Sequence, residues 1–405
     1  MVLEDSLENW KEVSIGEICS SIKSGGTPLS KVTEYYENGQ IPWLKTKEIK
    51  NSRIYGAENY ITELGLLNSS ASIIPANSIS VAMYGDGGTA GRVGLTKIPL
   101  TTNQACCNLT VDESKGDYEF IFYNLLGSYD DLVAMKTGSG QQNLSSTLIK
   151  NFKLNLPPLP EQRAIAAVLS SLDNKIDLLH RQNATLEALA ETLFRQWFVE
   201  EAKEEWEEVT ITKLFEIRDG THDSPKQKAF GKRLVTSKHI SGNKLDFESA
   251  YFISEEDFTN VNKRSRVDSG DILFSMIGTI GLTYLEQSET VDYAIKNIGL
   301  LKTSQNPAWC YYTYLWIKSS LGQDFIHEHR SGSTQEYISL GSLRGIIFKK
   351  PPTSLLTRFN DAMKPLFDKR KTNSAAIQTL STLRDTLLPK LMSGEVRVNT
   401  TDGKA

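Results

Sequence analysis

The feature that most constrains this 405-residue chain is an internal repeat. The segment 138–145 (GSGQQNLS) resembles 332–339 (GSTQEYIS), 194 positions later, and the same offset relates 156–158 (LPP) to 350–352 (KPP). Other matches fall at offsets of 196 (Trp10–Ile15 with Trp206–Ile211) and 190 (Gly88–Gly91 with Gly278–Gly281). Small insertions between strands produce such drift. The chain is therefore predicted to be a tandem duplication with pseudo-twofold symmetry.

Each half begins with a globular part, residues 1–156 and 204–351, in which short apolar runs alternate with Gly, Asn and Asp turns. Runs such as 78–83 and 270–275 predict strands. Residues 118–126 and 309–321 predict short helices. The predicted fold class is therefore α+β, with two tandem mixed α/β domains that alternate with two long helices.

The long helices are predicted at 157–203 and 352–395, followed by a tail at 396–405. Pro160 and Glu161 suit the first turn of the first helix. Its predicted seam has 4-3-4-3 spacing and contains one polar residue, Asn183: Ile165, Leu169, Leu172, Ile176, Leu179, Asn183, Leu186, Ala190, Leu193 and Trp197. The second helix has a weaker seam: Phe359, Met363, Leu366, Arg370, Asn373, Ile377, Leu380, Leu387 and Leu391. Such stripes require a partner, and we expect the two helices to pair as an antiparallel coiled coil.

Composition is typical of a soluble globular protein, with 39% hydrophobic and 23% charged residues. No run of eighteen apolar residues exists, so we expect no membrane span, and the acidic first ten residues lack a signal sequence. The cysteines at 19, 106, 107 and 310 include an adjacent pair, whose side chains would point to opposite faces of a strand. We expect all four to be reduced, in the cytoplasm.

A search for catalytic motifs favours a protein without catalytic residues, cofactor or metal of its own. A DNA methyltransferase needs an amide next to a Pro-Pro-aromatic turn, and neither Pro-Pro pair of this chain fits that motif. Residues 85–91 resemble a GxGxxG loop but have Ala90 in place of the third glycine. No P-loop is present. Glu48-Ile49-Lys50 lacks the upstream Asp of a nuclease, and His327 and His329, two apart on a helix, face different ways.

The loops instead carry residue types that contact DNA. Lysine suits phosphate, whereas Gln and Asn can pair with adenine. The net charge of −4 is unusual for a DNA-binding protein, but positive charge is concentrated between 226 and 238. The candidate DNA-binding residues are Lys45, Thr46, Lys47, Tyr84, Thr89, Arg92, Gln104, Ser139, Gln141, Gln142, Asn143, His222, Lys226, Lys228, Lys238, His239, Thr279, Ser333, Thr334 and Gln335.

These motifs resemble the specificity subunit of type I restriction-modification systems. The resemblance is carried by Ile41-Pro42-Trp43, by 83–91, by Thr102-Asn103-Gln104-Ala105, by 156–162 (LPPLPEQ) and by the ending 387–396 (LLPKLMSGEV). It spans nearly the whole chain. In the second half, Thr353-Ser354-Leu355 replaces the Leu-Pro-Glu-Gln stretch.

The resemblance implies two target-recognition domains, each recognising half of a split double-stranded DNA site. It also implies that the helices dock two methyltransferase subunits, which bring S-adenosylmethionine, and through them endonuclease-translocase subunits, which bring ATP and Mg²⁺. The expected partner-binding positions are Ile165, Leu169, Leu172, Ile176, Leu186, Leu193, Trp197, Leu380, Leu387 and Leu391. Two alternatives stay open: a single-chain restriction or methyltransferase enzyme, and a coiled-coil interaction protein without DNA affinity.

Overall fold

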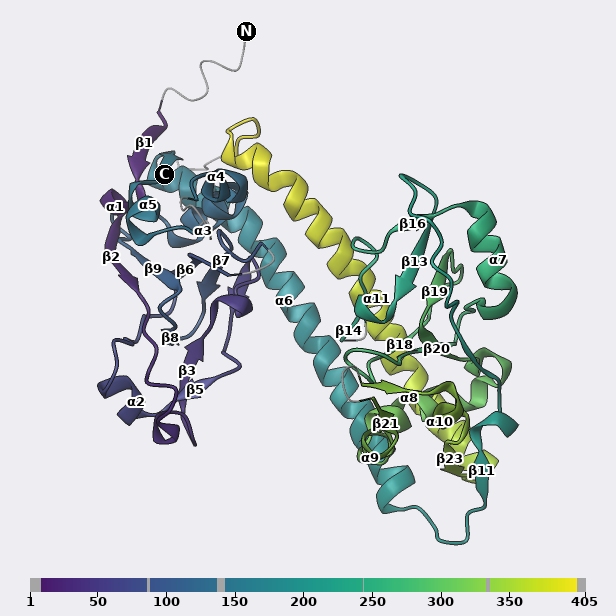
Figure 1. The fold of residues 1–405 in the computed structure, drawn as a ribbon. Helices are drawn as coiled ribbons and strands as arrows, with labels where there is room; N and C mark the ends of the chain where they lie inside the picture. The colour runs from purple at the N-terminus through teal and green to yellow at the C-terminus, as the bar shows by residue number, and fades with distance from the viewer. Residues whose placement is uncertain (1–8, 86–87, 137–142, 243, 333–335, 399–405) are drawn as a thin grey trace, which may run out of the picture. The chain divides into compact units, whose positions relative to one another are not determined.

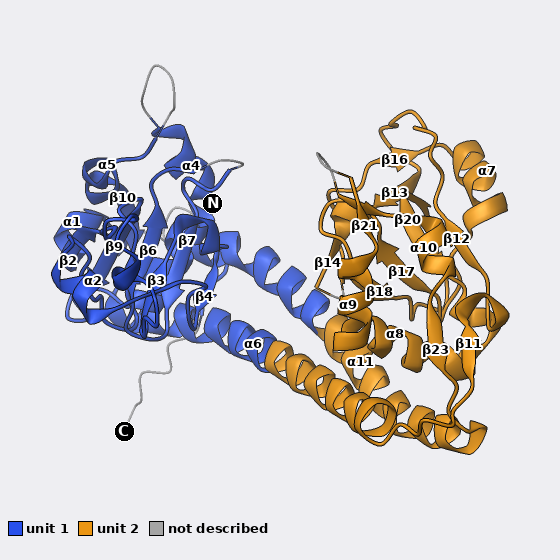
Figure 2. Cartoon of the chain, turned by 60° about the horizontal axis from the view of Figure 1, so that its bottom comes forward, with its two compact units in different colours: residues 1–178, 377–405 blue, residues 179–376 orange. Residues whose placement is uncertain are grey.

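The computed structural model describes residues 9–85, 88–136, 143–242, 244–332 and 336–398 (Figure 1). The chain forms two compact units, residues 1–178 with 377–405, and residues 179–376 (Figure 2). The boundaries of these units differ from the predicted domain boundaries, because each unit combines a globular part with portions of both long helices. Each unit therefore has its own core and is described separately.

Unit 1 is built on a five-stranded sheet in the order β2-β9-β6-β7-β4, beside a three-stranded sheet β5-β3-β8 and a pair β1-β10. Its strands are β1 (Lys11–Ser14), β2 (Cys19–Ser24), β3 (Ile41–Leu44), β4 (Ser52–Ile54), β5 (Tyr60–Ile61), β6 (Ile79–Ala82), β7 (Val93–Thr96), β8 (Thr101–Thr102), β9 (Cys106–Val111) and β10 (Lys153–Leu156). Its short helices are α1 (Ile15–Ile18), α2 (Glu63–Leu67), α3 (Tyr118–Gly127), α4 (Tyr129–Ala134) and α5 (Ser146–Asn151).

Unit 2 repeats this plan with a four-stranded sheet β12-β20-β17-β18, a three-stranded sheet β16-β13-β19 and a pair β11-β23. Its strands are β11 (Glu208–Thr210), β12 (Ile217–Asp219), β13 (Lys232–Thr236), β14 (Ile240–Ser241), β15 (Lys244–Leu245), β16 (Phe252–Ile253), β17 (Ile272–Ser275), β18 (Thr283–Leu285), β19 (Tyr293–Lys296), β20 (Ile298–Leu301), β21 (Arg330–Ser331), β22 (Tyr337–Ile338) and β23 (Ile347–Lys349). Its helices are α7 (Glu255–Ser265), α8 (Cys310–Lys318), α9 (Ser320–Glu328) and α10 (Leu340–Arg344).

Hydrogen bonds confirm that the two units are copies of one fold. In unit 1 the amide of Ala82 donates to the carbonyl of Arg92 at 2.9 Å, and in unit 2 the amide of Ser275 donates to the carbonyl of Leu282 at 2.8 Å. The parallel pair β3–β8 of unit 1 likewise corresponds to the parallel pair β13–β19 of unit 2. The duplication predicted from the sequence is therefore present in the backbone.

Local chemistry explains where α3 begins and why the cysteines form no disulfide. Asp117 caps α3 by accepting a hydrogen bond from the amide of Phe120 at 2.9 Å. Cys106 and Cys107 belong to different hydrophobic clusters, because successive side chains on β9 point to opposite faces. All four cysteines are free thiols, which confirms the prediction that they form no disulfide.

The two long helices are α6 (Leu159–Arg195), which continues as a π-helical turn over Gln196–Glu200, and α11 (Thr353–Met392). In unit 1, Arg384 Nη1 of α11 lies 2.9 Å from Asp173 Oδ1 of α6. In unit 2, Asn373 Nδ2 of α11 donates to Asn183 Oδ1 of α6 at 2.9 Å. In both units, the helices run antiparallel, as predicted, and Asn183 meets a polar partner in the seam.

The seam itself departs from the predicted heptad in its second half. After Ala190, a predicted seam position that is buried, the buried residues are Phe194 of α6 and Phe198 of the π-helical turn, whereas the predicted Leu193 and Trp197 are only half-buried. An α-helix drifts by about 20° per heptad, and a straight helix therefore moves its buried face away from a strict 3.5-residue pattern. The aromatic rings of Phe198 and Phe359, 4.7 Å apart, form the centre of the unit 2 core.

Candidate functional site

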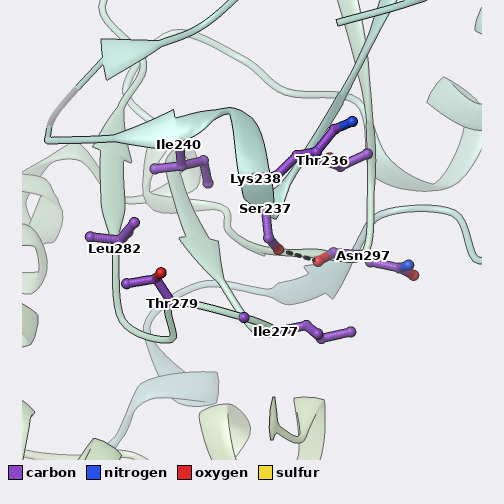
Figure 3. A pocket seen from close by; sticks show the side chains of 9 residues that line it. Thr236, Ser237, Lys238, Ile240, Ile277, Thr279, Leu282 and Asn297 are labelled. Carbon is purple, nitrogen blue, oxygen red and sulfur yellow. Dashed lines mark hydrogen bonds between the residues drawn. The ribbon is translucent and has the colours of Figure 1, made fainter. Parts of the chain in front are cut away.

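In unit 2, three segments meet where β13 and β19 end. They are the turn Ser237–His239 (η5) after β13, the β17–β18 turn around Gly278 and Thr279, and the residue Asn297 after β19. Ser237 Oγ donates to the carbonyl of Asn297 at 2.8 Å and ties two of them together. The loops enclose an open pocket of about 490 Å³ (Figure 3).

The pocket is lined by both apolar and polar side chains. Figure 3 shows Ile240 and Leu282 on one side, and Lys238, Asn297 and Ile277 on the other. Lys238 is exposed, and within the described residues no acidic side chain forms an ion pair with it. The pocket is therefore a surface at which a cation and apolar groups are available together.

His239 is a correction to the predicted set. Its side chain is buried, with 1% of its surface exposed, and Nδ1 accepts a hydrogen bond from the amide of Thr236 at 2.8 Å. Burial, and next the charge of Lys238, lower the pKa of the ring, which favours the neutral acceptor form. His239 therefore supports the η5 turn, and its burial excludes it from the surface that would meet DNA.

Three other predicted residues of unit 2, His222, Lys226 and Lys228, lie on the loop between β12 and β13. Lys226 and Lys228 are exposed, and the amide of Lys228 donates to the carbonyl of Phe252 at 2.9 Å, which holds the loop beside β16. His222 lies 2.8 Å from Asp219 Oδ2 and 3.0 Å from Asn297 Oδ1, so its exposed ring braces this loop against the pocket. Thr279 is exposed at the pocket rim.

In unit 1, the corresponding turn is Thr46–Glu48 (η2), after β3. Glu48 takes the place of His239, because its carboxylate accepts a hydrogen bond from the amide of Lys45 at 2.9 Å. The lysines of this turn already have partners: Lys45 Nζ donates to Asn59 at 3.0 Å, and Lys47 Nζ lies 2.8 Å from Glu58. The cations of unit 1 are therefore more neutralised than Lys238 in unit 2.

The glycine-rich turn of unit 1 follows β6. Tyr84, Thr89 and Arg92 are half-buried in or beside it, and Gly91 adopts a φ of 92°, a conformation that favours glycine. Gln104 is exposed and accepts a hydrogen bond from Thr27 Oγ1 of the loop after β2. Gln104 is therefore part of a cluster of loops in unit 1 that resembles the cluster in unit 2.

The loop around 138–143 is described only at its end. The half-buried Asn143 precedes Leu144, whose amide donates to the carbonyl of Met83 at 2.8 Å, beside the glycine-rich turn. Six predicted contacts lie outside the described residues: Ser139, Gln141, Gln142, Ser333, Thr334 and Gln335.

Several residues of the unit 2 pocket were missing from the predicted set, namely Thr236, Ser237, Ile277, Leu282 and Asn297. The repeat held the signal that identifies two of them, because Ile277 and Leu282 occupy the places of the predicted residues Tyr84 and Arg92. Residues were chosen from the sequence by their polarity, which overlooked the apolar ones.

The predicted partner-binding positions on the helices need a second correction. Ile165, Leu169, Ile176 and Leu391 have at most 7% of their surface exposed and belong to the interior of this chain. A separate subunit has no access to them. The exposed apolar positions on the helices include Leu189 and Leu383, with exposures of 44% and 45%, which are 194 positions apart.

A search of the described residues for catalytic groups gives no metal-binding cluster of three or more His, Cys, Asp or Glu side chains. His329 stacks on Phe325 with the ring centroids 4.0 Å apart. Burial raises the pKa of the Cys310 thiol to about 12. The hydrogen bond with Thr303 acts in the opposite direction, but its effect on the pKa is smaller than that of burial. Among the described helices, none has the length and hydropathy needed to cross a bilayer.

Comparison with known proteins gives a consistent result. The family model for the type I restriction modification DNA specificity domain matches twice, at residues 7–188 and 203–380. The chain is 26% identical over 416 aligned residues to the type I restriction enzyme MjaIX specificity subunit of Methanocaldococcus jannaschii, covering 96% of this chain and 94% of that protein. It is 31% identical over 169 residues, 40% of each chain, to the EcoR124I/EcoR124II specificity subunit of Escherichia coli.

Among solved structures, the type I restriction-modification S subunit from M. genitalium has a similar fold, with a TM-score of 0.56, 17% sequence identity, and coverage of 95% of this chain and 96% of that one. The two matches to the family model together span most of the sequence and fall on the two repeats found in the backbone. The chain therefore belongs to the type I restriction-modification DNA specificity family and carries two copies of its domain.

Proposed function

We propose that this chain is the non-catalytic specificity subunit of a type I restriction-modification complex, and that each unit binds one half of a bipartite duplex site. The observation that carries the proposal is the duplicated loop cluster: the same strand ends bear the turns Thr46–Glu48 and Ser237–His239. Two similar surfaces in one chain suit two half-sites. Loops on a rigid sheet are where binding residues are commonly found.

The residue types in these clusters support a DNA ligand. The exposed Lys226, Lys228 and Lys238 suit phosphate, and Gln104 and Thr279 present groups that can contact base edges. Between Asp223 and Asp246 the sequence contains no acidic residue. This segment is therefore a local positive surface in a chain whose net charge is −4.

For the protein partners, we propose two methyltransferase subunits, with endonuclease-translocase subunits attached through them. Leu189 and Leu383 are equivalent by the repeat and equally exposed, so each would contact one copy of the same subunit. S-adenosylmethionine, ATP and Mg²⁺ would be bound by these partners. In native mass spectrometry, Leu189→Glu and Leu383→Glu should each reduce the methyltransferase stoichiometry from two to one. Unchanged stoichiometry in both variants would contradict the assignment.

The main experiment exchanges residues 1–156 for the corresponding domain of another specificity subunit. With partner subunits present, methylation mapping should show a change in one half of the target only, because the other unit is untouched. A change in both halves would refute the two-surface proposal.

Two measurements address the alternatives. Calorimetry of the purified chain with S-adenosylmethionine should show no binding, and binding would support a single-chain methyltransferase. A mobility-shift assay with methyltransferase present should show a shifted duplex. Absence of a shift would favour an interaction protein without DNA affinity.

A further inference from the structure

The two copies of the loop cluster have the same backbone but different side chains at two matched positions. The hydrogen bonds that pair Ala82 with Arg92 and Ser275 with Leu282 place Arg92 and Leu282 at the same point of the fold. The residues after Met83 and Met276 correspond in the same way, and they are Tyr84 and Ile277. Unit 2 therefore has two aliphatic side chains where unit 1 has a phenol and a guanidinium.

In unit 2, these aliphatic side chains face a space large enough for a ligand. Ile277, Leu282 and the buried Ile240 line the pocket of about 490 Å³, together with Thr236 and Thr279. Ile277 and Leu282 are only half-buried, so part of their apolar surface remains open to solvent. The nine lining residues include Lys238 and no carboxylate, so the pocket also suits a partner with nearby negative charge.

Among the groups on the edges of DNA bases, the one that matches an aliphatic wall is the 5-methyl group of thymine in the major groove. Guanine presents two acceptors there, and it would leave Ile277 and Leu282 without a complementary group. A phosphate alone would satisfy Lys238 but not the aliphatic side chains. We propose that Ile277 and Leu282, which line this pocket, are specificity-determining contacts for the methyl group of a thymine in the second half-site, with Lys238 on an adjacent phosphate.

This inference rests on the proposed function, because it requires that unit 2 binds duplex DNA. It extends the proposed function by naming one base, a thymine, that unit 2 would contact. At the matched position of unit 1, Arg92 offers donors of the kind that recognise guanine, so the two half-sites should differ in the base contacted at this point.

The test begins with the full chain assembled with its methyltransferase subunits and a pool of randomised duplexes. Sequencing of the selected duplexes gives both half-sites, and each thymine is then replaced singly by uracil, which lacks only the methyl group. One replacement in the second half-site should weaken binding about fourfold, the value expected for one buried methyl group.

The matching protein variants are Ile277→Ala and the milder Ile277→Val. In Ile277→Ala, the difference between thymine and uracil at that position should disappear, and in Ile277→Val it should shrink. Ile347→Ala is the control, since Ile347 is an exposed isoleucine on β23 that does not line this pocket, and it should keep the fourfold difference. Thermal unfolding of each variant checks that it is folded.

Three results would overturn the inference: a second half-site without any A·T pair, uracil replacements that are all neutral, or a fourfold loss that persists in Ile277→Ala. In each of these cases the complex would still select a bipartite sequence. A complex that selects no sequence at all would instead refute the proposed function itself, so the two failures are distinguishable.

Discussion

Asp173 lies at the centre of a buried polar network that joins the globular part of unit 1 to both long helices. Its carboxylate is 7% exposed, accepts a hydrogen bond from the Tyr123 hydroxyl at 2.7 Å, and lies 2.9 Å from Arg384 Nη1. Burial raises the pKa of Tyr123 well above its usual range, so this hydroxyl stays protonated and donates. Substitution of Asp173 by Ala removes the acceptor of the buried Tyr123 hydroxyl and one of the two carboxylates paired with the half-buried Arg384, which also lies 2.8 Å from Asp385.

The expected cost follows from that geometry. Removal of one partner of a fully buried ion pair typically destabilises a protein by about 3–5 kcal/mol. Arg384 has 21% of its side chain exposed and keeps its pair with Asp385, so a loss at the lower end, about 3 kcal/mol, is expected. For a unit of 150–250 residues, each kcal/mol lowers the melting temperature by about 2–4 °C, so Asp173→Ala should lower it by about 6–12 °C. Arg53, whose side chain is 1% exposed and pairs with Glu119 at 3.2 Å, adds further positive charge to the same network.

The assay is differential scanning calorimetry of the full chain, with Asp368→Ala as the matched control. Asp368 forms an exposed helical pair with Lys364 at 2.6 Å, and such pairs contribute about 0.5 kcal/mol or less. The double variant Asp173→Ala, Arg384→Met should recover part of the loss, because it removes the half-buried cation that Asp173 pairs with in the wild type. If Asp173→Ala and Asp368→Ala lower the melting temperature equally, the network does not stabilise unit 1 in the way argued here.

Three further predictions concern charge, thiols and pH. Lys238→Ala should reduce the salt slope of DNA binding by about one unit, whereas Lys47→Ala, whose ammonium is already paired with Glu58, should reduce it less; equal reductions would contradict the difference. Because burial raises the pKa of the Cys310 thiol to about 12, iodoacetamide at pH 8 should alkylate it only after unfolding, and mass spectrometry of the native chain would reveal the contrary. His239 has a lowered pKa in the folded state, so the stability of unit 2 is complete above about pH 6.5 and decreases as the pH falls through the folded value. The melting temperature should therefore fall more steeply between pH 7.5 and 5.5 in the wild type than in His239→Gln, and parallel curves would refute this role.

Much of the fold followed from patterns that local physics makes reliable. The repeat, the strands at 78–83 and 270–275, the helix at 118–126 and the two long antiparallel helices are all present. The details that failed depend on tertiary packing. A heptad pattern could not reveal that Phe194 and Phe198 replace Leu193 and Trp197 in the core, because that choice depends on the aromatic rings of Tyr312 and Phe359 packed against them.

The candidate site was less predictable, for a physical reason. Selection by polarity and charge identifies Lys238 and Lys47 equally, yet only the structure shows that Glu58 pairs with one of them. The same selection chose His239, although its ring is buried and accepts a hydrogen bond from the amide of Thr236. Whether a polar group serves the fold or a ligand depends on its partners, which the order of residues does not specify.

Glu48 and His239 occupy equivalent positions in the two units, and they show how the duplication separates residues that maintain the fold from residues that determine specificity. Each side chain accepts a hydrogen bond from the amide of the residue before its turn, Lys45 or Thr236, at 2.9 and 2.8 Å, so two different chemistries maintain one backbone shape. The turn can therefore keep its position while its exposed side chains change. Substitution of exposed loop residues usually costs little stability, so a new half-site preference can arise in one unit without disturbing the other. Two independently variable surfaces on one duplicated scaffold are the physical basis that we propose for recognition of a site in two unlike halves.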